Sequence, residues 1–342
     1  MEYPIRLAIV GCGTVAERFH APALRSFQGF SPVVMVDRQL HRAELLKSYF
    51  PSCVAETDFT KLREHVDAAI VALPNDLNAM VATQLLQAGI SVLVEKPAAL
   101  NVESARELET AALKGRAKLA VGFIRREALG VRMARECIAS GMLGDIKRVS
   151  VEDGYPFSWE AVNDFRFDRT RGGGILFDIG SHVLDMLTFW FGDIQIKRFA
   201  DDRRGGVETN AHIELETQSG IPGTVELSWT RSLRNTARIV GTRGTLDVEW
   251  YMNAARLALP NGLHTLSGEV TGDCRLCGGA DAFPMMFLAQ LCRWCAWLRD
   301  ETRAEERVAD ASDGRRNIEL ISSCRAMREQ MAEPWREGVT AG

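Results

Sequence analysis

The fold of this chain is decided near its beginning by the stretch Ile5-Arg6-Leu7-Ala8-Ile9-Val10-Gly11-Cys12-Gly13-Thr14-Val15-Ala16. Its first half is apolar, as a buried strand is, and its second half gives the pattern G-x-G-x-x-A at the start of a helical segment. The glycines permit a tight turn and the close approach of a pyrophosphate, which would lie at the positive end of the helix. The stretch therefore predicts a strand, a turn and a helix that bind a dinucleotide. The expected contacts are Gly11, Gly13, Thr14 and Val15.

Two later strand ends add to the expected dinucleotide site. Asp37 ends the second strand, at a workable distance from the glycine turn for the acidic residue that binds the ribose. Its carboxylate would repel a 2′-phosphate and so favours NAD, whereas Arg38 beside it would clasp that phosphate and leaves NADP open. A further contact is expected at the turn Leu73-Pro74-Asn75, where the Asn75 amide can hydrogen-bond ribose or phosphate oxygens. A plain turn would have the same sequence.

The first 122 residues alternate apolar strand-like runs with helical patterns. This alternation predicts a doubly wound parallel sheet with right-handed crossovers. The expected strands are 6–10, 32–36, 68–73, 91–94 and 118–122, and the expected helices are 15–27, 40–50, 76–88 and 102–114.

Beyond a helix at 129–140 the pattern changes to strands with a period of two residues. Such strands are typical of a predominantly antiparallel sheet with one covered face and one open face. We therefore expect an α/β protein with a dinucleotide-binding domain over 1–122 and a substrate-binding and oligomerisation domain over 123–342. The clearest of these strands are 211–216, 224–230 and 245–250, and the helices expected to cover them are 174–191, 284–300 and 311–329.

Composition sets limits on partners and location. The chain has 342 residues, of which 46% are hydrophobic and 25% charged, and its net charge is -4 without a basic block. Binding to nucleic acid through phosphate neutralisation is therefore not expected. The first ten residues have no basic n-region, and no apolar run approaches the roughly 20 residues that span a bilayer. We expect no membrane partner and a cytoplasmic location.

The eight cysteines are consistent with reduced thiols. Cys274 and Cys277, followed by Cys292 and Cys295, have a spacing similar to that of a zinc ribbon. The second pair, however, falls in an amphipathic helical pattern over 283–298, on a face shared with apolar residues. We therefore expect ordinary packing of these thiols and no metal site.

The tripeptide Glu95-Lys96-Pro97 closes the apolar run 90–94. A lysine at the carboxyl end of a strand in an open α/β sheet points into the crevice where such sheets hold ligands. Pro97 lacks an N–H and ends the strand. The tripeptide predicts an amine beside the bound dinucleotide.

A second set of titratable residues follows the glycines at 172–174. A helix beginning there would place Asp178 and His182 four residues apart on one face, with Asp185 three residues further. Oxidation of a secondary alcohol by hydride loss to a nicotinamide requires a base for the hydroxyl proton. Either Lys96 or His182 can serve as that base, with the other as hydrogen-bonding partner and Asp178 as the orienting group.

Taken together, these motifs resemble the glucose–fructose oxidoreductase, inositol dehydrogenase and rhizopine-catabolism family (Gfo/Idh/MocA). The resemblance implies a Rossmann domain, an open antiparallel domain, NAD(P)-dependent hydride transfer, and sugars, inositols or related polyols as substrates. It also implies homodimers or homotetramers built on the open sheet face. The motifs that carry it are Gly11 to Ala16, His20-Ala21-Pro22-Ala23-Leu24, Glu95-Lys96-Pro97, Gly122-Phe123-x-Arg125-Arg126, Gly172 to Asp185 and Gly241-Thr242-x-Gly244-Thr245-Leu246.

The resemblance also implies residue roles. Lys96 matches the catalytic lysine, Asp178 and His182 match the family's Asp and His, and Glu95 matches a position close to the nicotinamide ribose. On the substrate side lie Lys96, Asp178 and His182, with Arg125 or, by preference, Arg126, and Arg166.

One position departs from the family pattern. Asn78 stands where the pattern commonly carries His, and because Asn can also donate and accept, we expect it among the cofactor contacts. A nucleotide-binding regulator or sensor of the same fold is the alternative function. The presence of Lys96, Asp178 and His182 argues against it, because a sensor needs no proton-transfer groups.

Overall fold

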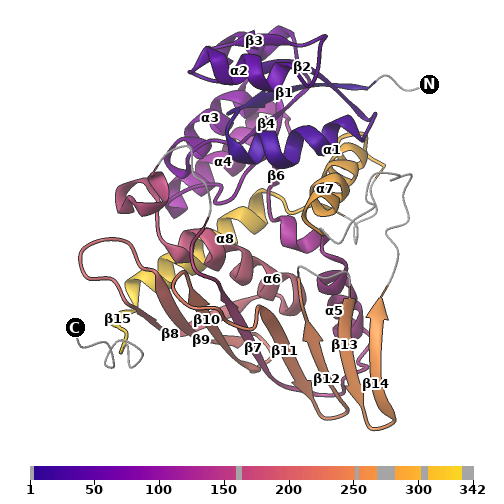
Figure 1. Cartoon of the computed structure of the whole chain (residues 1–342), viewed down its shortest axis with the longest axis vertical. Coiled ribbons are helices and arrows are strands. Elements are labelled where there is room, and N and C mark those ends of the chain that lie inside the picture. The colour runs from indigo at the N-terminus through magenta and orange to yellow at the C-terminus, as the bar shows by residue number, and fades with distance from the viewer. Residues whose placement is uncertain (1–3, 159–163, 251–253, 268–281, 302–306, 333–342) are drawn as a thin grey trace.

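The computed structural model describes residues 4–158, 164–250, 254–267, 282–301 and 307–332, which form two β-sheets with helices between and around them (Figure 1). No helix in these ranges is long and apolar enough to cross a membrane. The first sheet is built from the N-terminal part of the chain and the second from the part after residue 145. The boundary at residue 122 remains a prediction.

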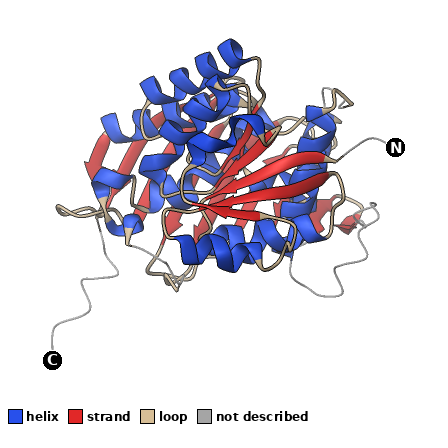
Figure 2. Cartoon of the chain, turned by 90° about the horizontal axis from the view of Figure 1, so that it is seen from above, coloured by secondary structure: helices blue, strands red, loops and turns tan. Residues whose placement is uncertain are grey.

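The first sheet has six parallel strands in the order β3-β2-β1-β4-β5-β6. Helices lie on both of its faces (Figure 2), so its central strands are buried on both sides and read as continuous apolar runs. The predicted doubly wound sheet is confirmed. Its strands are β1 (Ile5–Val10), β2 (Phe30–Val36), β3 (Val54–Glu56), β4 (Ala68–Val71), β5 (Ser91–Val94) and β6 (Leu119–Val121).

The helices of this part follow the expected positions, with a difference near the glycine turn and an additional short helical turn, η2 (Phe59–Glu64), that was not predicted. The helix expected over 15–27 begins as a π-helical turn, because Pro22 has no N–H to continue the regular ladder. The elements are η1 (Ala16–His20), α1 (Ala21–Arg25), α2 (Leu40–Lys47), η2 (Phe59–Glu64), α3 (Asn75–Gln87) and α4 (Val102–Gly115).

The second sheet has nine strands in the order β14-β13-β12-β11-β7-β10-β9-β8-β15. Two neighbouring pairs, β7 with β10 and β8 with β15, are parallel and the others are antiparallel, which confirms the predominantly antiparallel prediction. Its strands are β7 (Ile146–Gly154), β8 (Ile194–Asp201), β9 (Asn210–Thr217), β10 (Pro222–Ser228), β11 (Thr236–Gly241), β12 (Thr245–Val248), β13 (Ala254–Leu259), β14 (Gly262–Ser267) and β15 (Arg328–Gln330).

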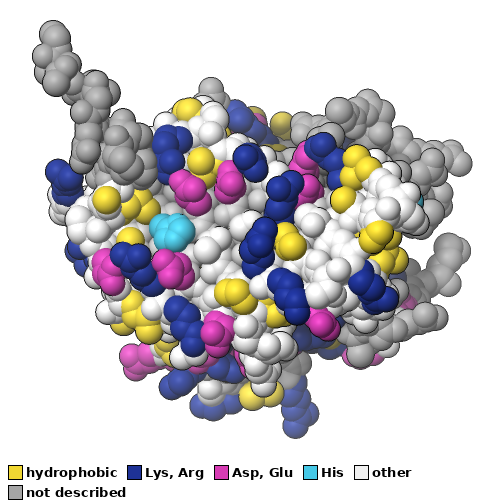
Figure 3. Space-filling view, turned by 90° about the horizontal axis from the view of Figure 1, so that it is seen from below, with side chains coloured by type: hydrophobic (Ala, Val, Ile, Leu, Met, Phe, Trp, Pro, Cys, Tyr) yellow, Lys and Arg dark blue, Asp and Glu magenta, His cyan; other side chains and the backbone are white. Residues whose placement is uncertain are grey.

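One face of this sheet is apolar and covered by helices, and the other is polar. The alternate residues Ala211, Ile213 and Leu215 are buried, and Ile213 pairs with Val225 in the neighbouring strand. On the side of the molecule away from the first sheet, positive and negative side chains are interspersed (Figure 3). The elements of this part that contact the sheet include α5 (Leu129–Ala139), η6 (Leu176–Gly180) and α6 (Ser181–Phe191). Three short helical turns belong to the same part of the chain: η3 (Ile124–Glu127), η4 (Phe165–Phe167) and η5 (Arg169–Arg171).

The last two helices connect the second sheet back to the first. Helix α7 (Ala282–Leu298) packs on η1 and α1, where Trp294 is fully buried against Phe30. The Cys295 thiol is buried in the same contact, as expected for a cysteine that packs among apolar residues. Cys274 and Cys277 lie outside the described residues. Helix α8 (Ala311–Ala326) lies between α4 and α6.

A buried ionic cluster joins η3, α6 and α8. The Arg126 guanidinium donates two hydrogen bonds to the Asp185 carboxylate, at 2.9 and 2.6 Å, and one to Asp313 at 3.1 Å. All three side chains are buried. Charges in such a place are tolerated only when they are paired, so the cluster fixes the relative positions of three helical segments.

Removal of Arg126 is therefore expected to be strongly destabilising. Arg126→Met removes the bidentate partner of buried Asp185 and leaves Asp313 with Arg307 as its cation among the described residues. It should lower the free energy of unfolding by about 3–5 kcal/mol, measured by urea denaturation. Arg238→Met removes an exposed bidentate partner of Asp247 and should cost less than about 1 kcal/mol. Equal losses in the two variants would contradict this reading of the cluster.

Candidate active site

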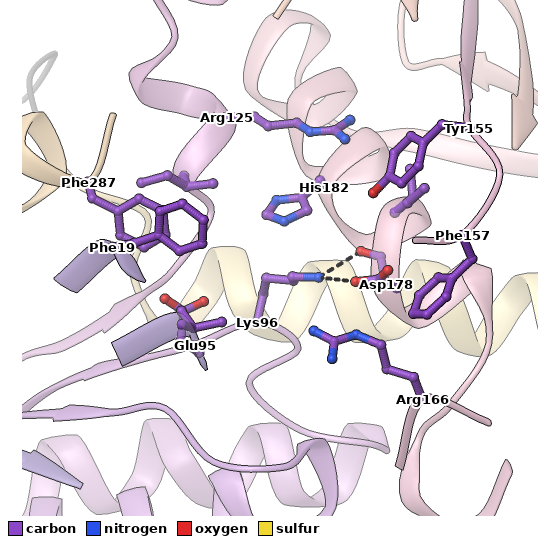
Figure 4. A pocket seen from close by; sticks show the side chains of 13 residues that line it. Phe19, Glu95, Lys96, Arg125, Tyr155, Phe157, Arg166, Asp178, His182 and Phe287 are labelled. Carbon is purple, nitrogen blue, oxygen red and sulfur yellow. Dashed lines mark hydrogen bonds and ion pairs between the residues drawn. The ribbon is translucent and has the colours of Figure 1, made fainter. Parts of the chain in front are cut away.

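Two adjoining pockets lie between the glycine turn and the second domain. The larger cleft runs along the carboxyl ends of the first sheet's strands. The smaller pocket, whose lining side chains are drawn in Figure 4, continues from it toward α6 and α7. A cofactor in the cleft would therefore meet a substrate in the pocket at the place where the two join. The residues common to both walls are Val15, Glu95, Lys96, Arg166 and Asp178.

The cleft contains nearly all of the cofactor contacts expected from the sequence. The glycine turn has the shape that a pyrophosphate requires: Gly11 has φ +97°, and a Cβ there would lie 2.3 Å from the Ala72 carbonyl oxygen. A Cβ on Gly13 would have no atom within 4 Å, so the loop faces open space. These residues fit a dinucleotide. The predicted residues in its wall are Gly11, Gly13, Thr14, Val15, Asp37, Arg38, Leu73, Pro74, Asn75, Glu95 and Lys96.

Asp37 is fixed at the rim of this cleft by the main chain. One carboxylate oxygen accepts a hydrogen bond from Cys12 N at 3.0 Å and the other from Gln39 N at 2.9 Å. Each oxygen keeps lone pairs for a further donor, as ribose hydroxyls require. Arg38 and Arg42 line the same rim.

Asn78 does not face the cleft, which corrects its expected role as a cofactor contact. It is fully buried in the first turns of α3. Its Oδ1 accepts from Leu73 N at 3.1 Å, and its Nδ2 donates to the carbonyl oxygens of Glu95 and Pro97 at 3.2 and 3.3 Å. The buried main-chain N–H and carbonyl groups that follow β4 and β5 need hydrogen-bond partners, and the Asn78 amide supplies them. It therefore holds the ends of the two strands together beneath the site.

Lys96 and Asp178 meet across the junction, although they come from different domains. The Lys96 ammonium donates to Asp178 Oδ1 at 2.8 Å and to the Asp178 carbonyl oxygen at 3.0 Å (Figure 4). Burial alone would raise the pKa of Asp178, but the positive charges of Lys96 and Arg166 outweigh burial and lower it. Asp178 is therefore a carboxylate at neutral pH.

His182 lies one turn after Asp178 and lines the same pocket. Its Nδ1 has no hydrogen-bond partner among the described residues. Burial, followed by the positive charges of Lys96 and Arg125, lowers the pKa of His182 well below its usual 6.5. The imidazole is therefore neutral at pH 7, with a nitrogen lone pair free for a proton or a hydroxyl donor.

The arginine that reaches this pocket is Arg125, and the preference for Arg126 was wrong. Adjacent residues of the short helix η3 point in different directions, so Arg126 enters the buried cluster with Asp185 while Arg125 lines the pocket. The Arg125 guanidinium lies over the Trp250 ring at 4.8 Å and pairs with the fully buried Asp153 at 2.5 Å. Arg166 lines both the cleft and the pocket, as expected for a residue on the substrate side.

Four aromatic residues of the pocket carried no motif in the sequence. Phe19 and Phe287 stack with ring centroids 5.0 Å apart on one side of Lys96, while Tyr155 and Phe157 lie on the other (Figure 4). They come from η1, α7 and the segment after β7. Single aromatic residues on separate elements give no periodic signal, so only the tertiary structure identifies them.

The segment 171–174 closes one side of the cleft and is bonded to the first domain. Asn75 Nδ2 donates to the Gly172 carbonyl oxygen at 2.9 Å. Arg171 forms a bidentate pair with Asp76, with bonds of 3.1 and 3.2 Å. Asn75 thus supports the cleft wall in addition to the ligand contact expected of it.

Comparisons with known proteins agree with this geometry. Residues 5–123 match the family model described as "Oxidoreductase family, NAD-binding Rossmann fold", and residues 131–247 match the one described as "GFO/IDH/MocA C-terminal domain". D-glucoside 3-dehydrogenase of Escherichia coli (strain K12) is 32% identical over 200 residues, which are 57% of this chain and 56% of that protein. dTDP-3,4-didehydro-2,6-dideoxy-alpha-D-glucose 3-reductase of Streptomyces violaceoruber is 28% identical over 256 residues, 72% of each chain.

Solved structures share the fold. An oxidoreductase from Thermotoga maritima has a TM-score of 0.82 at 20% identity, over 95% of this chain and 96% of that one. Levoglucosan dehydrogenase in complex with NADH has a TM-score of 0.82 at 18% identity, over 95% and 96% of the two chains. At this level of identity the likeness shows the architecture alone.

The depressed pKa of His182 predicts how stability depends on pH. Below about pH 6.5 the unfolded chain protonates this histidine and the folded chain does not, so acid favours unfolding. Relative to His182→Gln, the wild type should lose up to ~1.4 kcal/mol per pH unit as the pH falls below that value. Urea denaturation of both proteins between pH 5 and 7.5 measures the difference, and parallel curves would contradict a neutral His182.

Proposed function

This chain belongs to the Gfo/Idh/MocA family of NAD-binding oxidoreductases, and we propose that it transfers a hydride between nicotinamide and a hydroxyl or keto group of a sugar-like substrate. The observation that carries the proposal is the meeting of Lys96, Asp178 and His182 where the cofactor cleft joins the smaller pocket. A dinucleotide-binding regulator of the same fold would need the cleft but not these three groups.

When bound, the nicotinamide dinucleotide supplies the group that accepts or donates the hydride. The chain's contribution is to bind and orient it. The glycine turn would hold the pyrophosphate, and Asp37 would accept hydrogen bonds from the ribose. Because the Asp37 carboxylate is held by two backbone N–H groups, it cannot swing away from a 2′-phosphate, which supports a preference for NAD over NADP. Arg38 and Arg42 at the same rim are the groups that would accommodate NADP.

His182 is the group we propose as proton acceptor when the substrate is oxidised. It is neutral at pH 7, so it can take the hydroxyl proton directly. Lys96 is engaged as an ammonium with Asp178, and it can donate a hydrogen bond to the same substrate oxygen. In the reverse direction His182 would return the proton to the carbonyl oxygen, while the carbonyl carbon takes the hydride. Asp178 orients Lys96 in both directions.

The pocket's two kinds of wall support a ring-shaped polyol as the substrate. Lys96, His182 and Asp178 provide donors and acceptors for hydroxyl groups, while Tyr155 and Phe157 provide flat apolar surfaces. A sugar or inositol ring has the same combination, with hydroxyl edges and C–H faces. The names of the relatives, a glucoside dehydrogenase and a keto-sugar reductase, agree with this class.

We further propose that residues 123–342 form the substrate domain and that two or four copies associate through the open face of the second sheet. The support is the mixed charge of that face, where cross-strand pairs such as Arg198 with Glu214 and Arg238 with Asp247 alternate in sign. A surface that carries both positive and negative side chains can pack against the same surface of a second copy without net electrostatic repulsion.

The function is tested with Lys96→Ala and a substrate panel. The panel contains cyclitols, aldoses, glycosides and their keto forms, each with NAD and NADP. We expect Lys96→Ala to bind the cofactor nearly as the wild type does and to lower turnover by about 10²-fold or more, because the lysine acts on the substrate oxygen. Cofactor binding is followed by NADH fluorescence.

Lys147→Ala is the matched control, since Lys147 is an exposed lysine on the second sheet with only a surface partner, Asp145. It should leave turnover unchanged. Unchanged turnover in Lys96→Ala would exclude the proposed mechanism, and binding of cofactor without turnover of any panel member would favour the regulator.

A further inference from the structure

Behind the junction of cleft and pocket lies a second carboxylate, Glu95, with its own buried partner. Glu95 lines both the cofactor cleft and the substrate pocket, next to Lys96. His20, in η1, is completely buried behind it, and His20 Nε2 lies 2.7 Å from Glu95 Oε1. The proton-transfer scheme above uses neither residue. Their contact nevertheless joins the first turns after the glycine motif to the end of β5.

The surroundings of His20 decide which atom carries the proton. Its Nδ1 has no hydrogen-bond partner among the described residues, and its ring meets the Phe287 ring edge-on at 4.9 Å. A lone pair on Nε2 would repel a carboxylate oxygen only 2.7 Å away, so this nitrogen must present a hydrogen to Glu95. His20 Nε2 therefore carries a hydrogen and donates it to Glu95 Oε1.

The other oxygen of Glu95 is confined as well. A Cβ added to Gly122 would lie 2.8 Å from Glu95 Oε2, so only glycine leaves room for the carboxylate in this position. Held by His20 on one side and fitted against Gly122 on the other, the carboxylate has little freedom to turn. Its side chain is 14% exposed, and that exposed part faces the junction.

We propose that His20 is a positioning residue that fixes the Glu95 carboxylate at the junction, and that this carboxylate makes the site bind oxidised nicotinamide more tightly than reduced nicotinamide. The inference rests on the proposed function, because it takes the nicotinamide to lie where cleft and pocket join. The oxidised ring carries a positive charge and the reduced ring does not, so a fixed negative charge beside it acts on one form only.

The neighbouring charges leave Glu95 as the carboxylate available for this task. Asp178 is engaged with Lys96 at 2.8 Å and is also under the positive charge of Arg166. Asp153 is buried and paired with Arg125. Glu95, by contrast, is paired with the His20 imidazole and with no lysine or arginine among the described residues.

The test is the ratio of the dissociation constants for NADH and NAD⁺, measured without substrate by NADH fluorescence and by competition. Glu95→Gln keeps the shape of the side chain and removes its charge, and it should lower this ratio by about fivefold or more, the scale of a single charge interaction near a protein surface. His20→Leu, which frees the carboxylate, should shift the ratio in the same direction. His20→Gln, which can present an amide N–H to Glu95, should restore it toward the wild-type value.

A double variant separates positioning from general damage. In the Glu95→Gln background, His20→Leu should have no further effect on the ratio, because no charge remains to be positioned. Equal weakening of both cofactor forms, with an unchanged ratio in Glu95→Gln, would overturn the inference. That outcome leaves the proposed function standing, whereas failure of the wild type to bind either cofactor form would overturn the proposed function itself.

Discussion

The contact between Lys96 and Asp178 is the constraint on which the site depends. The ammonium stands at the end of β5 in the first sheet, and its acceptors belong to the turn that begins α6 in the second domain. Both partners are largely withdrawn from water, so neither domain can leave the other without exposing an unpaired charge. The same contact holds Lys96 beside His182, whose pKa is lowered first by burial and then by the positive charges of Lys96 and Arg125. One ion pair thus places the reacting groups next to one another.

Much of the fold was predictable because its signals are local. The parallel strands are apolar runs that end at turns, and the Gly11 turn, Lys96 and the helix carrying Asp178 and His182 each have a motif within a few residues. The antiparallel sheet was recognisable from alternation, since Ala211, Ile213 and Leu215 all face the core. The order of the strands in the second sheet and the packing of α7 against the first sheet depend on contacts between residues that are far apart in the chain. A local sequence pattern therefore cannot predict them.

The errors in the site have the same origin. Arg125 and Arg126 are neighbours in one short helix, and only the position of Asp185 decides which of them is drawn away from the pocket. Asn78 has the chemistry of a ligand contact, but the strand ends above it take up its whole amide. The aromatic walls are assembled from three elements that are far apart in the chain. The sequence identified which residue types could take part in the site. It could not show where their side chains point, because that depends on the tertiary structure.

The bonds from Asn75 and Asp76 to the segment 171–174 have a consequence for the reaction cycle. The segment forms part of the cleft wall, so it would lie against a bound dinucleotide. It is held to the N-terminal end of α3 by a hydrogen bond from Asn75 and an ion pair with Asp76. If cofactor exchange requires this segment to move, one hydrogen bond and one partly exposed ion pair must open each time. Because salt screens such an ion pair, we expect the exchange rate to rise with ionic strength, while the groups that transfer the proton lie in another part of the molecule.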